Sequence, residues 1–183
     1  YTYVFQKQLK KLRTDKIDIY SLEGVCDLNK MRDIDSGAVD FLFEQREAGH
    51  IGCLGFSSEL SPDNLRDFIG RYPWDFVRMR VNYYDWFNKD GSARYDVAKE
   101  FNLPIIAHAA LRTGAASALK PEALSILKDA NPDRSSVDWA LRFVKSLDGI
   151  VSVTCNMHSV REVKENASVF DDTATLSPEE LNV

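Results

Sequence analysis

Polar side chains recur where apolar, strand-like runs of the sequence end, and two of them could take part in acid–base chemistry. Glu23 follows the run 17–22 and precedes Gly24. A carboxyl group partly shielded from water there would have a raised pKa and could donate a proton at neutral pH, whereas a solvated carboxylate would not. His108 ends the run 103–108, and its ring could stack on a planar ligand or exchange a proton. The other polar residues at such ends are Ser57, Ser58, Arg78, Arg80, Asn82, Asn156 and His158.

Two further segments have the composition of an anion-binding site. Residues 109–114 combine small side chains, which let a ligand approach the backbone, with Arg112, which could contact a phosphate. The lysine of a P-loop is absent from this segment. Residues 157–160 precede a helical pattern whose first backbone N–H groups favour anions, and Arg161 could assist there. The acidic group of Glu162 would oppose a second phosphate.

The same helical pattern carries Glu165 and Asn166, which could reach an adenine or ribose edge or could be ordinary solvated residues. Metal binding is not expected. Cys155, His108 and His158 are the candidate ligands, and no pair of them has a recognised metal-ligand spacing.

Composition excludes several classes of function. The 183 residues carry a net charge of −5, whereas nucleic-acid binding needs a basic face. No apolar run approaches the roughly 20 residues that span a bilayer. The three cysteines are few, odd in number and widely spread, which favours a reducing compartment such as the cytoplasm.

Strand-like runs alternate with helical patterns along the whole sequence, which predicts a parallel sheet covered by helices. The expected strands are 17–22, 51–56, 76–81, 103–108 and 150–154. The expected helices lie near 5–12, 37–48, 62–72, 97–101, 135–147, 160–170 and 177–180. Ser36, Ser61 and Ser135 are expected to cap three of them.

Two α/β architectures fit five βα units: an open doubly wound sheet, or part of a (β/α)8 barrel of the TIM type. No G-x-G-x-x-G follows any strand, which weakens the dinucleotide-fold version of the first. A complete barrel takes about 250 residues, so 183 residues would form an incomplete one. In either case residues 1–183 are predicted to form one domain.

Several segments, taken in order, resemble the aldo-keto reductases. Residues 9–20 look like that family's LxRLxxDYIDLY, and residues 37–57 are similar to its GALDxLxxLxxxGKIRxIGFS. Residues 72–85 resemble YPxDFVQxxYNYLD of a bacterial branch that often carries an iron–sulfur tail, while 131–143 and 164–166 match closing segments. The resemblance covers essentially the whole chain and implies the last five units of a (β/α)8 barrel.

The resemblance also implies a function and a set of binding residues. Members of the family transfer a hydride between NADPH or NADH and a carbonyl compound. Ser57 and Ser58 fall where the family binds the nicotinamide carboxamide, and His108 falls where a side chain packs on the nicotinamide ring. The segment from Leu111 through Arg112 to Gly114 falls where the pyrophosphate is covered. Asn156 belongs to the same expected cofactor site, and Glu165 and Asn166 fall where the adenine is held.

The sequence departs from the family pattern at several of these positions. The resemblance places the family's catalytic Asp, Tyr and Lys upstream of Tyr1, and its catalytic His is replaced by Glu23. A Glu at that position is found in members that reduce double bonds, which extends the expected substrates to enones. Arg78 stands where a nicotinamide-binding Gln is usual. Glu162 should disfavour the 2'-phosphate of NADPH by charge repulsion.

These observations lead to two main expectations, beside a third in which the same barrel scaffold carries a different enzyme activity. The first is an oxidoreductase of the aldo-keto reductase type, acting on a carbonyl or enone with a nicotinamide cofactor. The second is an inactive barrel remnant that serves in binding or assembly. Five parallel strands also leave two open edges, so we expect either preceding strands or a second copy of the chain to cover them.

Overall fold

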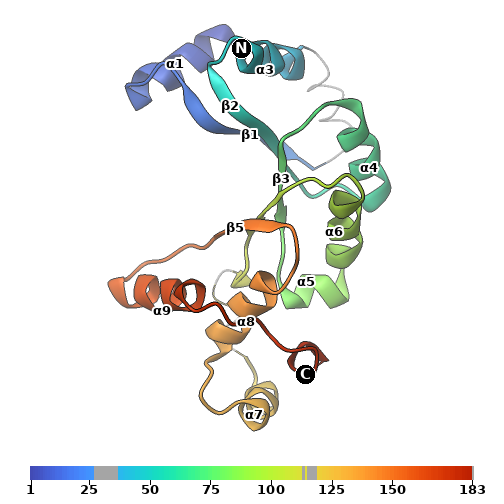
Figure 1. Cartoon of the computed structure of the whole chain (residues 1–183), viewed down its shortest axis with the longest axis vertical. Coiled ribbons are helices and arrows are strands. Elements are labelled where there is room, and N and C mark those ends of the chain that lie inside the picture. Colours follow the sequence, from blue (N-terminus) through green and yellow to red (C-terminus); the bar gives the residue numbers. More distant parts are fainter. Residues whose placement is uncertain (27–36, 113, 115–118, 183) are drawn as a thin grey trace. The chain divides into compact units, whose positions relative to one another are not determined.

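The computed structural model describes residues 1–26, 37–112, 114 and 119–182, in which strands and helices alternate (Figure 1). The strands are β1 (Ile17–Val25), β2 (Ile51–Ser58), β3 (Phe76–Arg80), β4 (Ile105–His108) and β5 (Ile150–Thr154). The helices are α1 (Thr2–Leu12), α3 (Ala38–Glu47), α4 (Pro62–Arg71), α5 (Tyr83–Asn88), α6 (Gly91–Glu100), α7 (Pro121–Ala130), α8 (Ser136–Lys145), α9 (Val160–Asp171) and the short 3-10 helix η2 (Glu180–Asn182).

The five strands form one parallel sheet in the order β1-β2-β3-β4-β5. Each strand therefore lies beside the next strand along the chain, as in a (β/α)8 barrel, whereas a doubly wound sheet reverses its order at a switch point. The strand order confirms the prediction of a barrel-type fold with five βα units. None of the described helices is long and apolar enough to cross a bilayer.

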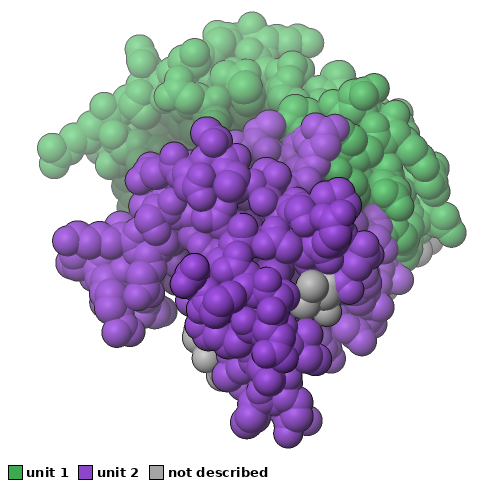
Figure 2. Space-filling model, turned by 60° about the horizontal axis from the view of Figure 1, so that its bottom comes forward, with its two compact units in different colours: residues 1–79, 93–105 green, residues 80–92, 106–183 purple. Residues whose placement is uncertain are grey.

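The chain divides into two compact units, which Figure 2 colours separately. The first unit contains residues 1–79 and 93–105, and the second contains residues 80–92 and 106–183. Each unit has buried apolar side chains of its own, so each is described by itself below. The single domain expected over residues 1–183 stays a prediction.

Aromatic packing and a close backbone approach hold the strands of the first unit. The rings of Phe56 and Phe68, Phe56 and Trp74, and Phe68 and Trp74 have centroids 4.8, 4.8 and 5.4 Å apart. At Gly55 an added Cβ would lie 2.4 Å from the carbonyl oxygen of Phe76, so only glycine lets β2 approach β3 this closely. Because β1, β2 and β3 run parallel, their carboxyl ends lie at the same edge of the sheet.

In the second unit, α8 packs against α5 and α9 (Figure 1). The ring of Phe143 on α8 has its centroid 5.6 Å from that of Trp86 and 6.4 Å from that of Phe87, both on α5. The contact with Trp86 is edge-to-face, an arrangement that adds about 0.5–1.5 kcal/mol to the burial of the ring area. These ring contacts hold α5 against α8.

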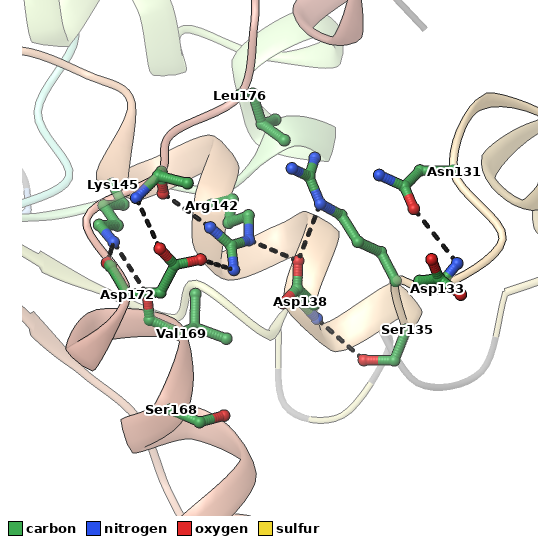
Figure 3. Close-up of polar contacts among 12 residues, drawn as sticks. Asn131, Asp133, Ser135, Asp138, Arg142, Lys145, Ser168, Val169, Asp172 and Leu176 are labelled. Atoms are coloured by element: carbon green, nitrogen blue, oxygen red, sulfur yellow. Dashed lines mark hydrogen bonds and ion pairs between the residues drawn. The ribbon is translucent and has the colours of Figure 1, made fainter.

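A polar network centred on Arg142 fastens the segment after α9 to α8 (Figure 3). The Arg142 side chain is 8% exposed, and its nitrogens donate at 2.7 Å to Asp138, to Asp172 and to the carbonyl oxygen of Ala174. The Lys145 ammonium donates to the carbonyl oxygen of Asp172. Each of these three Arg142 hydrogen bonds therefore ends on a carboxylate or main-chain oxygen.

The structure corrects some sequence-based boundaries. Strand β1 extends to Val25, because pairing with β2 resumes beyond the expected end at Leu22. Helices α5 and α7 were not expected from the sequence; α5 is only six residues long, and none of the residues of α7 is buried. Ser135 caps α8 as predicted, Ser61 begins α4 without a side-chain hydrogen bond, and Ser36 lies outside the described residues.

Removal of the Arg142 side chain should destabilise the protein. R142A leaves two carboxylates and a carbonyl oxygen without their donor, so we expect the free energy of unfolding to fall by about 2 kcal/mol or more. Urea unfolding followed by circular dichroism measures this. R161A removes an arginine that is 83% exposed on α9 and should change stability by less than about 0.5 kcal/mol. Equal losses in both variants would contradict the structural role of the network.

Candidate active site

An irregularity near the carboxyl end of β1 organises the polar residues of the first unit. Leu22 pairs with Phe56 and Val25 pairs with Ser58, so Glu23 and Gly24 together face the single residue between those partners, Ser57. Two residues opposite one define a β-bulge, which turns a side chain away from its regular direction. Gly24 accommodates the bulge with a φ of 85°, a conformation that other residues rarely adopt. Its backbone N–H donates to Ser57 Oγ at 3.0 Å.

Glu23 forms an ion pair with Arg78 on β3. Arg78 Nη1 lies 3.0 Å from both carboxylate oxygens of Glu23. The two side chains are 58% and 34% exposed, so water screens the pair and its contribution to stability is modest. The contact nevertheless fixes the direction of the Arg78 guanidinium. Its Nε and Nη2 groups carry three further N–H bonds that are not part of this ion pair.

The ion pair corrects the expectation that Glu23 has a raised pKa. Partial burial would raise the pKa of the carboxyl, but the Ser57 hydroxyl and the positive charge of Arg78 outweigh burial and lower it below its ordinary value of 4.5. Glu23 is therefore a carboxylate at neutral pH. It can accept hydrogen bonds and hold a cation, but it has no proton to donate.

The two serines of β2 take different places around this pair. Ser57 is nearly buried and contacts the bulge, while the hydroxyl of Ser58 accepts a hydrogen bond from the backbone N–H of Leu60 at 3.1 Å. The structure thus brings Glu23, Ser57 and Arg78 into direct contact, and Ser58 follows them along β2. This group supplies both hydrogen-bond donors and acceptors, which is what recognition of an amide requires.

In the second unit, His108 ends β4 and is followed by a tight turn. The carbonyl oxygen of His108 accepts the backbone N–H of Val81 at 3.1 Å, which fixes the residue beside the end of β3. Ala109 and Arg112 both adopt positive φ values, of 56° and 49°, which are uncommon for residues other than glycine. The backbone N–H of Arg112 donates to the carbonyl oxygen of Ala109 at 2.9 Å and closes the turn.

The remaining residues of this segment extend the turn. Leu111 lies within it, and its carbonyl oxygen accepts the backbone N–H of Gly114 at 3.0 Å. Gly114 has a φ of 86°, and Thr113 lies outside the described residues. The segment folds back on itself through main-chain hydrogen bonds, so its shape depends little on its own side chains.

The first turn of α9 is occupied by the chain's own acceptors. Ser159 Oγ accepts the backbone N–H of Glu162 at 3.2 Å, and a Glu162 carboxylate oxygen accepts the backbone N–H of His158 at 2.7 Å. This reciprocal pair is a capping box. The carboxylate of Glu162 therefore stands where the sequence suggested an external anion, and its charge already complements the positive end of the helix dipole.

Two neighbouring residues of α9, both expected to hold the adenine, face different surroundings. Asn166 is buried, whereas Glu165 is exposed and lies 3.8 Å from Arg161. Asn156, between β5 and α9, is exposed. The described residues contain no cluster of three or more His, Cys, Asp or Glu that could hold a metal ion.

The sequence did not predict a role for Asp85. Its side chain is buried beside Arg112, in the turn that follows β4. Its carboxylate lies near the side chains of Arg80, Lys89 and Arg112, and it pairs with Asn82, the N-cap of α5. The Asn-x-x-Asp spacing at the end of a strand is a capping signal that could have identified the pair. Its burial depends on tertiary packing that local spacing does not reveal.

Comparison with known proteins places this arrangement in a family. The sequence matches the profile of the Aldo/keto reductase family over residues 2–182. The chain belongs to this family. No curated protein matches the sequence at the same level of significance.

Solved aldo-keto reductases share the fold. The apo form of an aldo-keto reductase from Bacillus halodurans superposes with a TM-score of 0.76 at 20% identity, covering 99% of this chain and 65% of that one. Its holo form gives 0.77 at 20% identity, with 98% and 64% covered. An aldo/keto reductase from Brucella melitensis gives 0.74 at 19% identity, with 99% and 64% covered. The chain therefore spans slightly less than two thirds of the length of these reductases.

The charge of Arg78 should be one cause of the lowered pKa of Glu23. In R78Q, which keeps an amide donor but removes the charge, we expect the pKa of Glu23 to rise toward 4.5. Carboxyl carbon NMR titration of the two proteins measures the shift. In the wild type the ion pair contributes to stability at pH values above the ordinary pKa of Glu23. This contribution is lost as the pH falls through the lowered pKa of Glu23 in the folded protein. An unchanged titration in R78Q would contradict the ion pair.

Proposed function

We propose that this aldo-keto reductase chain binds a nicotinamide dinucleotide and takes part in hydride transfer to a small carbonyl or enone compound. The observation that carries the proposal is the contact group of Glu23, Ser57 and Arg78 at the bulge of β1. Barrel enzymes place their chemistry at the carboxyl ends of parallel strands, and this group lies at such ends. The family membership and the fold of the chain support the same reading.

The donors and acceptors of this group fit a nicotinamide carboxamide. The unengaged N–H bonds of Arg78 can donate to the carboxamide oxygen, and a serine hydroxyl of β2 can accept from its NH2 group. Glu23 holds Arg78 in this direction. Arg78 thus takes over the donor function of the usual Gln, and the bound cofactor would supply the hydride.

The charge state of Glu23 restricts the chemistry that the chain itself can perform. A carboxylate cannot protonate the alkoxide that forms when a carbonyl accepts a hydride. Its lowered pKa instead suits a role in orienting Arg78. The protonating Tyr of the family pattern is matched by no residue that we identified in this sequence. We therefore assign Glu23 to cofactor binding, through Arg78, and do not assign proton donation to it.

We further propose that NADH is preferred over NADPH. The Glu162 carboxylate is fixed at the start of α9 by the His158 N–H group, so it presents a negative charge where the family resemblance places the 2'-phosphate side. A phosphate dianion there would meet charge repulsion and would compete for backbone donors that are already used. Among the described residues, Cys26, Cys53 and Cys155 form no disulfide, which is compatible with a reducing compartment such as the cytoplasm.

Titration of the chain with NADH and NADPH tests the proposed cofactor. We expect quenching of tryptophan fluorescence and enhancement of the nicotinamide emission with NADH, and weaker binding with NADPH. R78M, which removes the donors of Arg78 but keeps much of its apolar stem, should weaken NADH binding by roughly tenfold, as expected for loss of a hydrogen bond to a polar ligand group. Binding of neither dinucleotide would overturn the proposal.

The cofactor preference should change in E162Q. Glutamine keeps the acceptor of the capping box but removes its charge, so NADPH should gain affinity relative to NADH by about three- to tenfold. D171N makes the same charge change at an exposed position near the other end of α9 and should leave the ratio of the two dissociation constants unchanged. An equal response of the two variants would mean that net charge, not the position of Glu162, sets the ratio.

A further inference from the structure

The second unit contains a buried carboxylate that the proposed hydride transfer does not use. Asp85, on α5, is 1% exposed. Asn82 Oδ1 accepts its backbone N–H at 2.8 Å, and Asn82 Nδ2 donates to its Oδ2 at 2.9 Å. The two side chains thus lock each other in place at the start of the helix. A charged group buried this deeply is tolerated only when other groups compensate its charge.

Three cations, each from a different segment, compensate Asp85. Arg80 Nε, at the end of β3, lies 3.9 Å from Oδ2. Lys89 Nζ, just after α5, lies 3.5 Å from Oδ1, and Arg112 Nε, in the turn after β4, lies 3.8 Å from the same oxygen. These cations are between about one third and one half exposed, whereas the carboxylate beneath them is not. One buried negative charge therefore gathers three positive charges at the surface.

Arg112 is held from a second side as well. Its guanidinium carbon lies 3.7 Å from the centroid of the Tyr84 ring, a cation–π contact at close range. The turn that carries it is also tied down, because Asn82 Nδ2 reaches the carbonyl oxygen of Ala109 at 3.3 Å. Ala109 and Arg112 are the described residues of this turn, other than glycine, with positive φ, so these contacts hold the residues whose backbone conformation is unfavourable.

We infer that Asp85 is a positioning residue: its buried carboxylate, fixed by Asn82, holds the Arg112 guanidinium against Tyr84 and so sets the direction in which Arg112 presents its charge. Among the described residues, none donates a hydrogen bond to Asp85 Oδ1. The cationic groups of Lys89 and Arg112 lie 3.5 and 3.8 Å from this oxygen. The carboxylate acts on Arg112 through charge at 3.8 Å and leaves the N–H groups of the guanidinium able to contact a ligand. That ligand, on the basis of the function proposed above, is the phosphate part of the cofactor.

A positioning role of Asp85 and its charge alone predict opposite changes in the affinity for an anion. Removal of a negative charge beneath three cations would strengthen the binding of any anion if charge alone mattered. If Asp85 positions Arg112, D85N should instead weaken NADH binding, by about tenfold, because the guanidinium loses its fixed direction. D90N, which makes the same change at an exposed neighbour, should leave NADH affinity unchanged. Tighter NADH binding by D85N would overturn the inference.

A spectroscopic measurement tests the inference without any cofactor. The ring current of Tyr84 should shift the Nε–H signal of Arg112 upfield, and slow exchange and a high heteronuclear NOE should report its fixed position. In D85N we expect this signal to move toward the value of a solvated arginine, whereas D90N should leave it in place. An unmoved Arg112 signal in a folded D85N protein would contradict the positioning role, whatever the outcome of the NADH titration.

A second variant covers the case in which D85N does not fold. Tyr84 is 42% exposed, so Y84L should fold normally. Its Arg112 Nε–H signal should lose the ring-current shift but keep its high heteronuclear NOE, because Asp85 is still present. A mobile Arg112 in Y84L would show that the aromatic ring alone holds it and would overturn the inference. Failure of NADH to bind any of these proteins, with the NMR results as expected, would affect only the proposed function.

Discussion

The polar site of the first unit depends on one extra residue in β1. Because Glu23 and Gly24 share a single partner on β2, the strand bends where its carboxyl end meets the neighbouring strands. The bend lets Ser57 Oγ accept the Gly24 N–H group and brings Glu23 within 3.0 Å of Arg78 on β3. A regular strand would place Glu23 directly opposite Ser57, on a fixed face of the sheet. The chemistry of the site therefore follows from a local backbone irregularity.

The two departures from the family pattern in this unit complement each other. By the family resemblance, Glu23 falls at the position of a His and Arg78 at that of a Gln, and the structure joins them as an ion pair. Either replacement by itself would put a charge without a counter-charge at this end of the sheet, and the ion pair supplies that counter-charge. Together they keep donors directed outward and leave a carboxylate that stays ionised. Relative to the family pattern, the pair thus provides charged hydrogen-bonding groups in place of neutral ones.

Much of the fold could be predicted from the sequence, because alternating apolar runs and helical patterns determine a parallel βα arrangement. The capping of α8 by Ser135 could also be predicted, because it depends only on residues three positions apart. The bulge at Gly24 could not be predicted, because it arises from register with β2. The burial of Asp85 likewise depends on helix packing, through Phe143, between segments distant in sequence. Helix α7 was missed although Pro121 in its first turn is a sequence signal for a helix start.

The attachment of the segment after α9 has a consequence for how this part of the protein can vary. Arg142 and Lys145 reach the carbonyl oxygens of Ala174, Val169 and Asp172. Main-chain oxygens are present whatever side chain a position carries. Most substitutions at Ala174 would therefore leave its anchoring bond available, whereas replacement of Arg142 or Lys145 by a neutral residue would remove the donors of these bonds. Substitutions should accordingly be tolerated more readily in the segment after α9 than at Arg142 and Lys145 of α8.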